Sequence, residues 1–254
     1  MSRFATRCPN CSGPIAFAWS QSVQTVCPHC RSVAVRHDFD VKALGQVASV
    51  PPDISPIQVG TRGRIDGRGF EVVGRIVYEY EDGGWNEWHL VFDGGESGWL
   101  SDAQAEYAIS APARPGVRLP AAGDLKVGQR FRFGDRDYVA TTITRAHYAA
   151  VEGELPFATW GRDVATFADL KTPTGHFGTI DYTENPPLLF LGRFAEFDEL
   201  SLSIFREFRG GLAEPAVRGF NCGACGAAIA LRAAQLTASG ACPACGPIVN
   251  PPDP

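Results

Sequence analysis

Eight cysteines, arranged in four closely spaced pairs, are the residues of this chain best suited to chemistry. Each pair is a Cys-x-x-Cys turn; fifteen residues separate the first two pairs and sixteen separate the last two. Two such turns at this separation are typical of a zinc ribbon, in which four thiolates surround one tetrahedral ion. The sequence therefore predicts two structural zinc ions, held by Cys8, Cys11, Cys27 and Cys30 and by Cys222, Cys225, Cys242 and Cys245.

The cysteine pattern leaves two alternatives open. Disulfides would use the same residues, but a cytoplasmic compartment keeps thiols reduced and favours metal. An N-terminal pair could also close with a C-terminal pair, although local closure costs less loop entropy. Four protein ligands leave no open coordination position for water or substrate, so we expect no catalysis at the metal.

The elements that must position the first four cysteines are short strands, expected at residues 15–19 and 23–26. Beyond them, a hairpin rich in tryptophan forms the centre of the chain. Residues 76–81 and 85–92 have the β-branched and aromatic composition of strands, and residues 82–84 form the turn between them. Alternation along the second strand predicts two faces. The face expected to be core holds Asn86, Trp88, Leu90 and Phe92, and the mixed face holds Trp85, Glu87, His89 and Val91.

The mixed face provides the candidate partner-binding residues, Trp85, Glu87 and His89. A rigid aromatic anchor beside two polar groups suits recognition of a protein partner. The competing interpretation is structural: Glu87 pairs across the hairpin with a cation such as Arg75, and Trp85 caps an open barrel end.

Proline- and glycine-rich linkers divide the chain into four segments. We expect an all-β protein with an N-terminal zinc ribbon (1–45), two small β-barrel or sandwich modules (55–111 and 123–208) and a C-terminal zinc ribbon (219–250). The two modules begin alike: residues 57–65 align with residues 125–133 at an offset of 68, and each segment carries Val-Gly at the same place. This similarity predicts duplication of one β-module.

Net charge and the lack of long apolar runs argue against a nucleic-acid-binding or membrane-spanning protein. The formal net charge is −5, so nucleic acid is not the expected partner. No apolar run approaches the roughly 18 residues that a membrane span needs, and residues 1–8 contain no signal-peptide stretch. The expected location is the cytoplasm, either free or peripheral to the inner membrane.

The central modules resemble a bacterial family of domains of unknown function, the DUF4178-type family. The resemblance rests on Trp-Asn-Glu-Trp at residues 85–88, Gly-Trp-Leu at residues 98–100, Gly-Thr-Ile-Asp-Tyr at residues 178–182 and Phe-Asp-Glu-Leu at residues 197–200. It covers roughly residues 55–205 and brings no catalytic residues. The resemblance to this family implies an accessory role in a membrane-associated bacterial system. The C-terminal ribbon is not part of the family pattern.

Enzymatic motifs are lacking from the chain. The sequence contains no GxSxG, HExxH or Walker motif, and its five histidines are scattered. A carboxylate pair of Glu87 with Asp181 would require the modules to bring the two together, and Asp181 is more simply interpreted as a strand residue facing solvent. We therefore expect no enzymatic activity.

Two non-catalytic functions fit the sequence. The first is a zinc-binding adaptor or scaffold that presents the mixed face to a protein partner. The alternative is a nucleic-acid-binding regulator, using the N-terminal ribbon and a row of arginines as a phosphate track. That row consists of Arg62, Arg64, Arg68, Arg130, Arg132 and Arg136.

Overall fold

Apart from two short 3-10 helices, the regular structure in the described part of the chain is β-strand, which confirms the all-β prediction. The computed structural model describes residues 4–37, 40–47, 55–116, 118–158 and 164–204, and four short strands beyond residue 217. The chain divides into two units, residues 1–206 and 207–254. No helix in the described residues has the length and apolar character needed to span a bilayer.

The N-terminal segment forms five short strands, here called the cysteine module (residues 4–47). Its first hairpin is a two-stranded sheet, and its next three strands continue into the main sheet. The strands are β1 (Phe4–Arg7), β2 (Pro14–Phe17), β3 (Gln24–Val26), β4 (Ser32–His37) and β5 (Asp40–Gln46).

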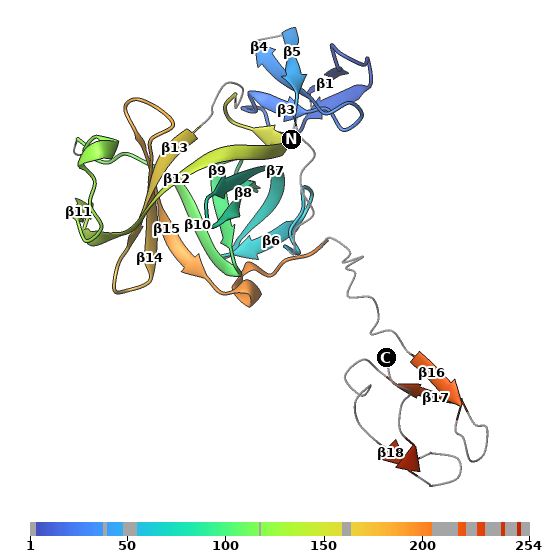
Figure 1. The fold of residues 1–254 in the computed structure, drawn as a ribbon. Helices are drawn as coiled ribbons and strands as arrows, with labels where there is room; N and C mark the ends of the chain where they lie inside the picture. Colours follow the sequence, from blue (N-terminus) through green and yellow to red (C-terminus); the bar gives the residue numbers. More distant parts are fainter. Residues whose placement is uncertain are drawn as a thin grey trace. The chain divides into compact units, whose positions relative to one another are not determined.

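The two central segments form one closed β-barrel rather than two separate ones (Figure 1). Eight antiparallel strands follow one another around the ring in the order β7, β8, β9, β10, β15, β14, β13, β12, and β12 pairs again with β7. The first segment supplies β6 (Arg62–Ile65), β7 (Arg68–Tyr80), β8 (Gly83–Phe92), β9 (Ser97–Ala103) and β10 (Glu106–Ala113). The second supplies β11 (Arg130–Phe133), β12 (Arg136–Leu155), β13 (Val164–Lys171), β14 (His176–Asp181) and β15 (Leu188–Ala195). The 3-10 helices are η1 (Ala122–Asp124) and η2 (Phe197–Leu200).

The repeat seen in the sequence recurs in the backbone. Strands β6 and β11, and the starts of β7 and β12, are related by the same offset of 68. Gly60 and Gly128 both have positive φ, 93° and 85°, which a glycine adopts at little cost. Their N–H groups donate to Val72 and Ala140 respectively, each at 2.8 Å. The two repeats meet along two pairs of neighbouring strands, which form the seams of the barrel. Each seam joins a strand to its counterpart in the other repeat, β7 with β12 and β10 with β15.

Three apolar clusters stabilise the barrel. One fills part of its interior and includes Ile76, Tyr78, Trp99 and Phe167. The other two cover outer faces, one for each repeat. The first contains Ile57, Ile65, Phe70, Val72, Trp88 and Leu90, and the second contains Leu125, Phe133, Tyr138, Ala140, Leu170 and Ile180. The residues that open the two repeats correspond at the offset of 68, so both repeats begin their outer core in the same way: Ile57, Ile65, Phe70 and Val72 with Leu125, Phe133, Tyr138 and Ala140.

The described residues of the second unit form two short antiparallel pairs of strands. These are β16 (Arg218–Asn221), β17 (Ala228–Leu231), β18 (Gly240–Ala241) and β19 (Ile248–Val249). The predicted ligands Cys222, Cys225, Cys242 and Cys245 lie outside the described residues, so the structure does not describe the metal site predicted for the second ribbon.

Candidate functional site

The cysteine module brings Cys8, Cys11, Cys27 and Cys30 together, as their spacing predicts. Their four Sγ atoms all lie within 4.8 Å of one another, and the pairs Cys8–Cys30 and Cys11–Cys27 are each 3.7 Å apart. Thiolates about 2.3 Å from a tetrahedral ion are about 3.8 Å apart, so this arrangement fits one metal ion. It is the one such group among the residues that the structure describes.

Local backbone geometry positions the thiols. The N–H of Ser12 donates to the carbonyl of Cys8 at 2.8 Å, and the N–H of Arg31 donates to the carbonyl of Cys27 at 2.9 Å. Each Cys-x-x-Cys segment thus forms a tight turn that ends on a residue with positive φ, 60° at Ser12 and 56° at Arg31. These turns point two sulfur atoms from each hairpin toward the same place.

A buried carboxylate joins the cysteine module to the barrel. Glu154, near the end of β12, accepts hydrogen bonds from the backbone N–H groups of Ala18 (2.7 Å) and Trp19 (3.1 Å) and from the hydroxyl of Ser22 (2.5 Å). Strand β3 pairs with the same stretch of β12, with Thr25 opposite Glu154. Nothing in the local sequence marked this residue as an anchor, because its partners lie more than 130 positions away.

The Trp19 side chain extends this junction. Its indole N–H donates to the carbonyl of Gly95 at 2.9 Å, and its ring meets the His89 ring edge to face at 5.0 Å. His89 is fully buried and hydrogen-bonds through Nδ1 to the Glu154 carbonyl (2.9 Å) and through Nε2 to Ser97 (2.8 Å). Burial lowers the pKa of His89 to about 4, so the ring is neutral at pH 7. His89 therefore lies at the junction between the cysteine module and the barrel, and its side chain is not exposed to contact a partner.

The sequence correctly divided the side chains of the second hairpin strand, β8, between two faces. The mixed face, which was expected to bind a partner, points into the barrel instead. Trp85 and Glu87 line cavities inside the barrel, whereas Trp88 belongs to an outer cluster. The pairing proposed between Glu87 and Arg75 is wrong. Arg75 lies opposite Trp88 in the register, and its guanidinium donates to Asn86 at 2.6 and 2.9 Å on the other face of the sheet.

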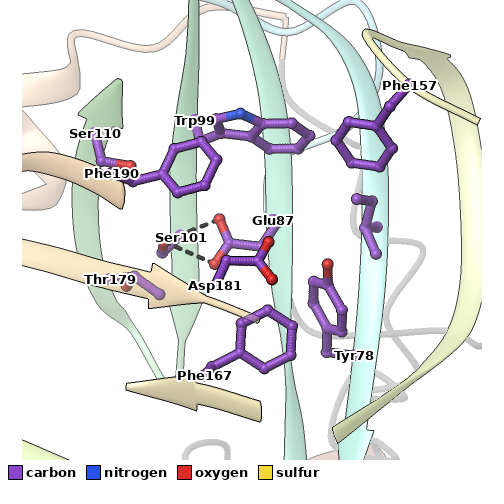
Figure 2. Close-up of a pocket in the computed structure, with 11 residues that line it drawn as sticks. Tyr78, Glu87, Trp99, Ser101, Ser110, Phe157, Phe167, Thr179, Asp181 and Phe190 are labelled. Atoms are coloured by element: carbon purple, nitrogen blue, oxygen red, sulfur yellow. Dashed lines mark hydrogen bonds between the residues drawn. The ribbon is translucent and has the colours of Figure 1, made fainter. Parts of the chain in front are cut away.

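Two adjoining cavities occupy the barrel interior. The inner cavity, of about 50 Å³, is lined from seven of the eight barrel strands and includes Trp99, Phe157 and Phe190 (Figure 2). The outer cavity, of about 170 Å³, extends to the hairpin turns near Gly84 and Gln104. The two share four lining residues, namely Glu87, Ser101, Phe167 and Thr179.

Glu87 lies at the boundary between the two cavities. The Ser101 hydroxyl donates to its two carboxyl oxygens at 2.9 and 3.0 Å, and the Trp85 indole N–H donates at 3.0 Å. Burial and, to a smaller extent, the charges of Asp169 and Asp181 together raise the pKa of Glu87 to about 8, against the opposing effect of these hydrogen bonds. Glu87 is therefore mostly protonated at pH 7.

The barrel brings further carboxyl groups to Glu87. Asp181 lines the inner cavity beside it (Figure 2), so the expectation that Asp181 faces solvent is wrong. Asp169 lines the outer cavity, accepts a hydrogen bond from Thr179 at 3.0 Å, and has its pKa raised by burial. Sequence alternation places Asp169 on the same face as Phe167, but it does not reveal that this face is the interior.

The arginine row proposed as a phosphate track is largely engaged with acidic neighbours. Ion pairs join Arg62 to Glu71 (3.2 Å), Arg68 to Glu96 (3.0 Å), Arg132 to Asp137 (3.1 Å) and Arg136 to Asp135 (3.4 Å). These neighbours offset the positive charge that a phosphate backbone would meet.

Fold and site together define a closed eight-stranded β-barrel protein with an acidic, aromatic interior and an attached tetrathiol module. Residues 58–197 match the family described as "Domain of unknown function (DUF4178)", and the chain belongs to that family. No curated protein and no solved structure matches the chain.

Proposed function

We propose that this protein is a non-catalytic adaptor that carries structural zinc ions and serves a membrane-associated bacterial stress or remodelling system. The observation that carries the proposal is the tetrathiol cluster, in which all four ligands come from the protein and the module is anchored to the barrel through Glu154. A metal held in this way has no open position for substrate, so its role is to hold an element in place.

Zinc is the ion that the donor set favours. Four thiolates in a tetrahedral arrangement suit Zn²⁺ or iron–sulfur chemistry, and two Cys-x-x-Cys turns on short hairpins are the ligand pattern of zinc ribbons. The second unit repeats the pattern at Cys222, Cys225, Cys242 and Cys245, so the proposal includes a second zinc ion there.

The division of the chain into two units also supports an adaptor role. The barrel and its cysteine module form one unit, and the second set of cysteines belongs to another. Such an arrangement suits a scaffold whose C-terminal unit contacts one partner while the barrel unit serves another. The family association supports a partner at the membrane. Because Trp85 and Glu87 line the barrel interior, the partner surface is proposed to lie outside the hairpin.

Affinity purification of the tagged chain from its own host tests the proposal. Soluble and detergent-solubilised membrane fractions should yield a defined protein partner with the wild type. The Cys222→Ser/Cys225→Ser variant should lose that partner and bind one zinc ion instead of two, with the barrel unit intact by circular dichroism. Trp85→Ala serves as the comparison, and should keep the partner because its side chain faces the interior.

Other results would contradict the proposal. Recovery of nucleic acid, lost on nuclease treatment and weakened steeply by salt, would support the regulator instead. A wild type that captures neither protein nor nucleic acid in either fraction would exclude an adaptor in that host. Zinc content unchanged by the double substitution would exclude the second ion.

A further inference from the structure

The outer cavity of the barrel is unfilled space surrounded by side chains that point inward. It measures about 170 Å³ and extends to the exposed turn residues Gly84 and Gln104. Trp85, Asp169 and Thr179 line it and are half-buried, so part of each side chain has no protein packed against it. Protein interiors are normally packed as densely as organic crystals. A space of this size inside a barrel is therefore a candidate ligand site.

Two pairs of aromatic rings form much of the apolar wall of this cavity. Trp85 of β8 meets Phe167 of β13 edge to face, with ring centroids 5.5 Å apart. Phe177 of β14 meets Phe194 of β15 in the same manner at 5.2 Å. All four residues line the outer cavity. Such a wall favours a flat, apolar ligand, because a further ring gains edge-to-face or offset contacts in addition to the area it buries.

The charged groups beside the cavity already compensate one another. Lys171 Nζ pairs at 3.2 Å with Glu106, which lines the cavity, and lies 4.5 Å from the centroid of the Phe194 ring. Burial raises the pKa of Asp169, and the positive charge of Lys171 opposes that rise. Burying a further charge without a partner of its own is costly. The wall therefore favours an uncharged ligand over a cation or an anion.

Polar groups lie where the outer cavity adjoins the inner one. Glu87, Ser101 and Thr179 line both cavities. The Ser101 hydroxyl donates to Glu87 at 2.9 and 3.0 Å, and the Thr179 hydroxyl donates to Asp169 at 3.0 Å. Each of these hydroxyl oxygens has lone pairs that can accept a hydrogen bond. One polar group on a ligand can be satisfied here, whereas a ligand with many hydroxyls would lose more hydrogen bonds to water than the wall replaces.

We propose that the outer cavity binds a small uncharged phenol or aromatic alcohol, with its ring against the two aromatic pairs and its hydroxyl group beside Ser101 and Thr179. The size fits, because a cavity of about 150 Å³ takes up benzene. The outer cavity, with about 170 Å³, has room for one ring with a single polar substituent, and every residue named for this site lines that same cavity. Ligand binding here is a further activity of the barrel unit, separate from the zinc-binding role.

NMR titration of the full-length protein with matched probes tests the proposal. Phenol and toluene have the same size and differ by one hydroxyl group, benzoate and benzylammonium carry opposite charges, and glucose has many hydroxyl groups. We expect saturable binding of phenol, at least about tenfold tighter than binding of either charged probe or of glucose, and no weaker than binding of toluene. A smaller margin over the charged probes or glucose, tighter binding of toluene than of phenol, or no saturable binding of phenol would overturn the proposal.

Filling the cavity separates binding at this site from binding elsewhere. Ala108 of β10 is buried and lines the outer cavity, so Ala108→Leu occupies the space and should weaken phenol binding by at least about tenfold. Ala111→Leu makes the same change at an exposed position on the opposite face of β10, and should leave the affinity unchanged. Unchanged phenol affinity in a folded Ala108→Leu variant would overturn the proposal.

A measurement on the wild type keeps the test decisive if Ala108→Leu does not fold. Intermolecular nuclear Overhauser effects should connect the ring protons of phenol with the Trp85 indole and the Ala108 methyl group, because both line the outer cavity. Effects to residues outside the cavity alone would place the phenol elsewhere and overturn the proposal.

Discussion

At the scale of single residues, the carboxyl group of Glu87 is held in an environment that opposes its charge. It receives hydrogen bonds from Ser101 and Trp85, but burial dominates and raises its pKa from 4.5 to about 8. A protein that kept this residue only for stability would gain by replacing it with a neutral group. A side chain whose pKa is strongly shifted inside a cavity is typical of a functional site.

The raised pKa predicts how stability depends on pH. Between about pH 4.5 and pH 8 the folded protein holds the Glu87 proton and the unfolded chain does not, so stability falls as pH rises through this window. Glu87→Gln removes this dependence. Relative to the wild type, we expect the variant to gain about 1 to 3 kcal/mol between pH 5 and pH 8, because one pKa unit corresponds to ~1.4 kcal/mol and partial exposure screens the shift.

Urea unfolding of both proteins at several pH values measures this difference. Glu96→Gln, at the surface, should follow the wild-type profile throughout. Parallel profiles for wild type and Glu87→Gln would show that Glu87 is ionised at neutral pH.

At the scale of elements, the backbones of β7 and β12 approach each other closely beside the junction with the cysteine module. Gly153 has a φ of 63°, and a Cβ there would lie 2.2 Å from the Val73 carbonyl oxygen. The neighbouring Gly74 is equally confined, because its Cβ would lie 2.1 Å from the Glu154 carbonyl oxygen. These glycines let β7 and β12 meet where Glu154 reaches the module.

Loss of the Glu154 charge should loosen the cysteine module and the barrel end together. Glu154→Gln leaves Ala18, Trp19 and Ser22 with a weaker acceptor in a buried place, and we expect a loss of about 1 to 3 kcal/mol in unfolding free energy. Hydrogen exchange should show faster opening at both β3 and the end of β12.

The exposed Glu81, in the turn after β7, provides the control for this substitution. Glu81→Gln should leave both the unfolding free energy and the exchange rates unchanged. Faster exchange confined to the cysteine module in Glu154→Gln would mean that the module and the barrel open independently.

At the scale of the whole molecule, the barrel is a joint product of two repeats. Each repeat contributes four strands to the ring, and both seams lie between repeats. A four-stranded half would expose two unpaired edges and one face of the interior cluster. The barrel interior, with Glu87 from one repeat and Asp181 from the other, exists only when the ring is closed.

Neither half should therefore fold as a monomer. We expect residues 55–116 expressed alone to give a poorly dispersed NMR spectrum or a self-paired dimer, and co-expression with residues 118–204 to restore a one-to-one complex with native-like dispersion. Size-exclusion chromatography with light scattering distinguishes these states. A folded, monomeric single repeat would show that each segment has a sufficient core of its own.

The sequence by itself determined the features that depend on local spacing. Cysteine spacing identified the tetrathiol group, the offset of 68 identified the repeat, and alternation sorted the β8 side chains into the correct two sets. These succeed because turn geometry and strand pleating are set by neighbouring residues.

Only the tertiary structure decided which of those sets faces the interior. Both faces of β8 are largely buried, so hydrophobicity could not tell an outer cluster from a barrel lining. Closure of the ring through β7 with β12 and β10 with β15 turned Trp85 and Glu87 inward, placed Asp181 beside Glu87, and let Glu154 capture the cysteine module. These contacts join residues far apart in the chain, and their partners are chosen by global packing rather than by local pattern.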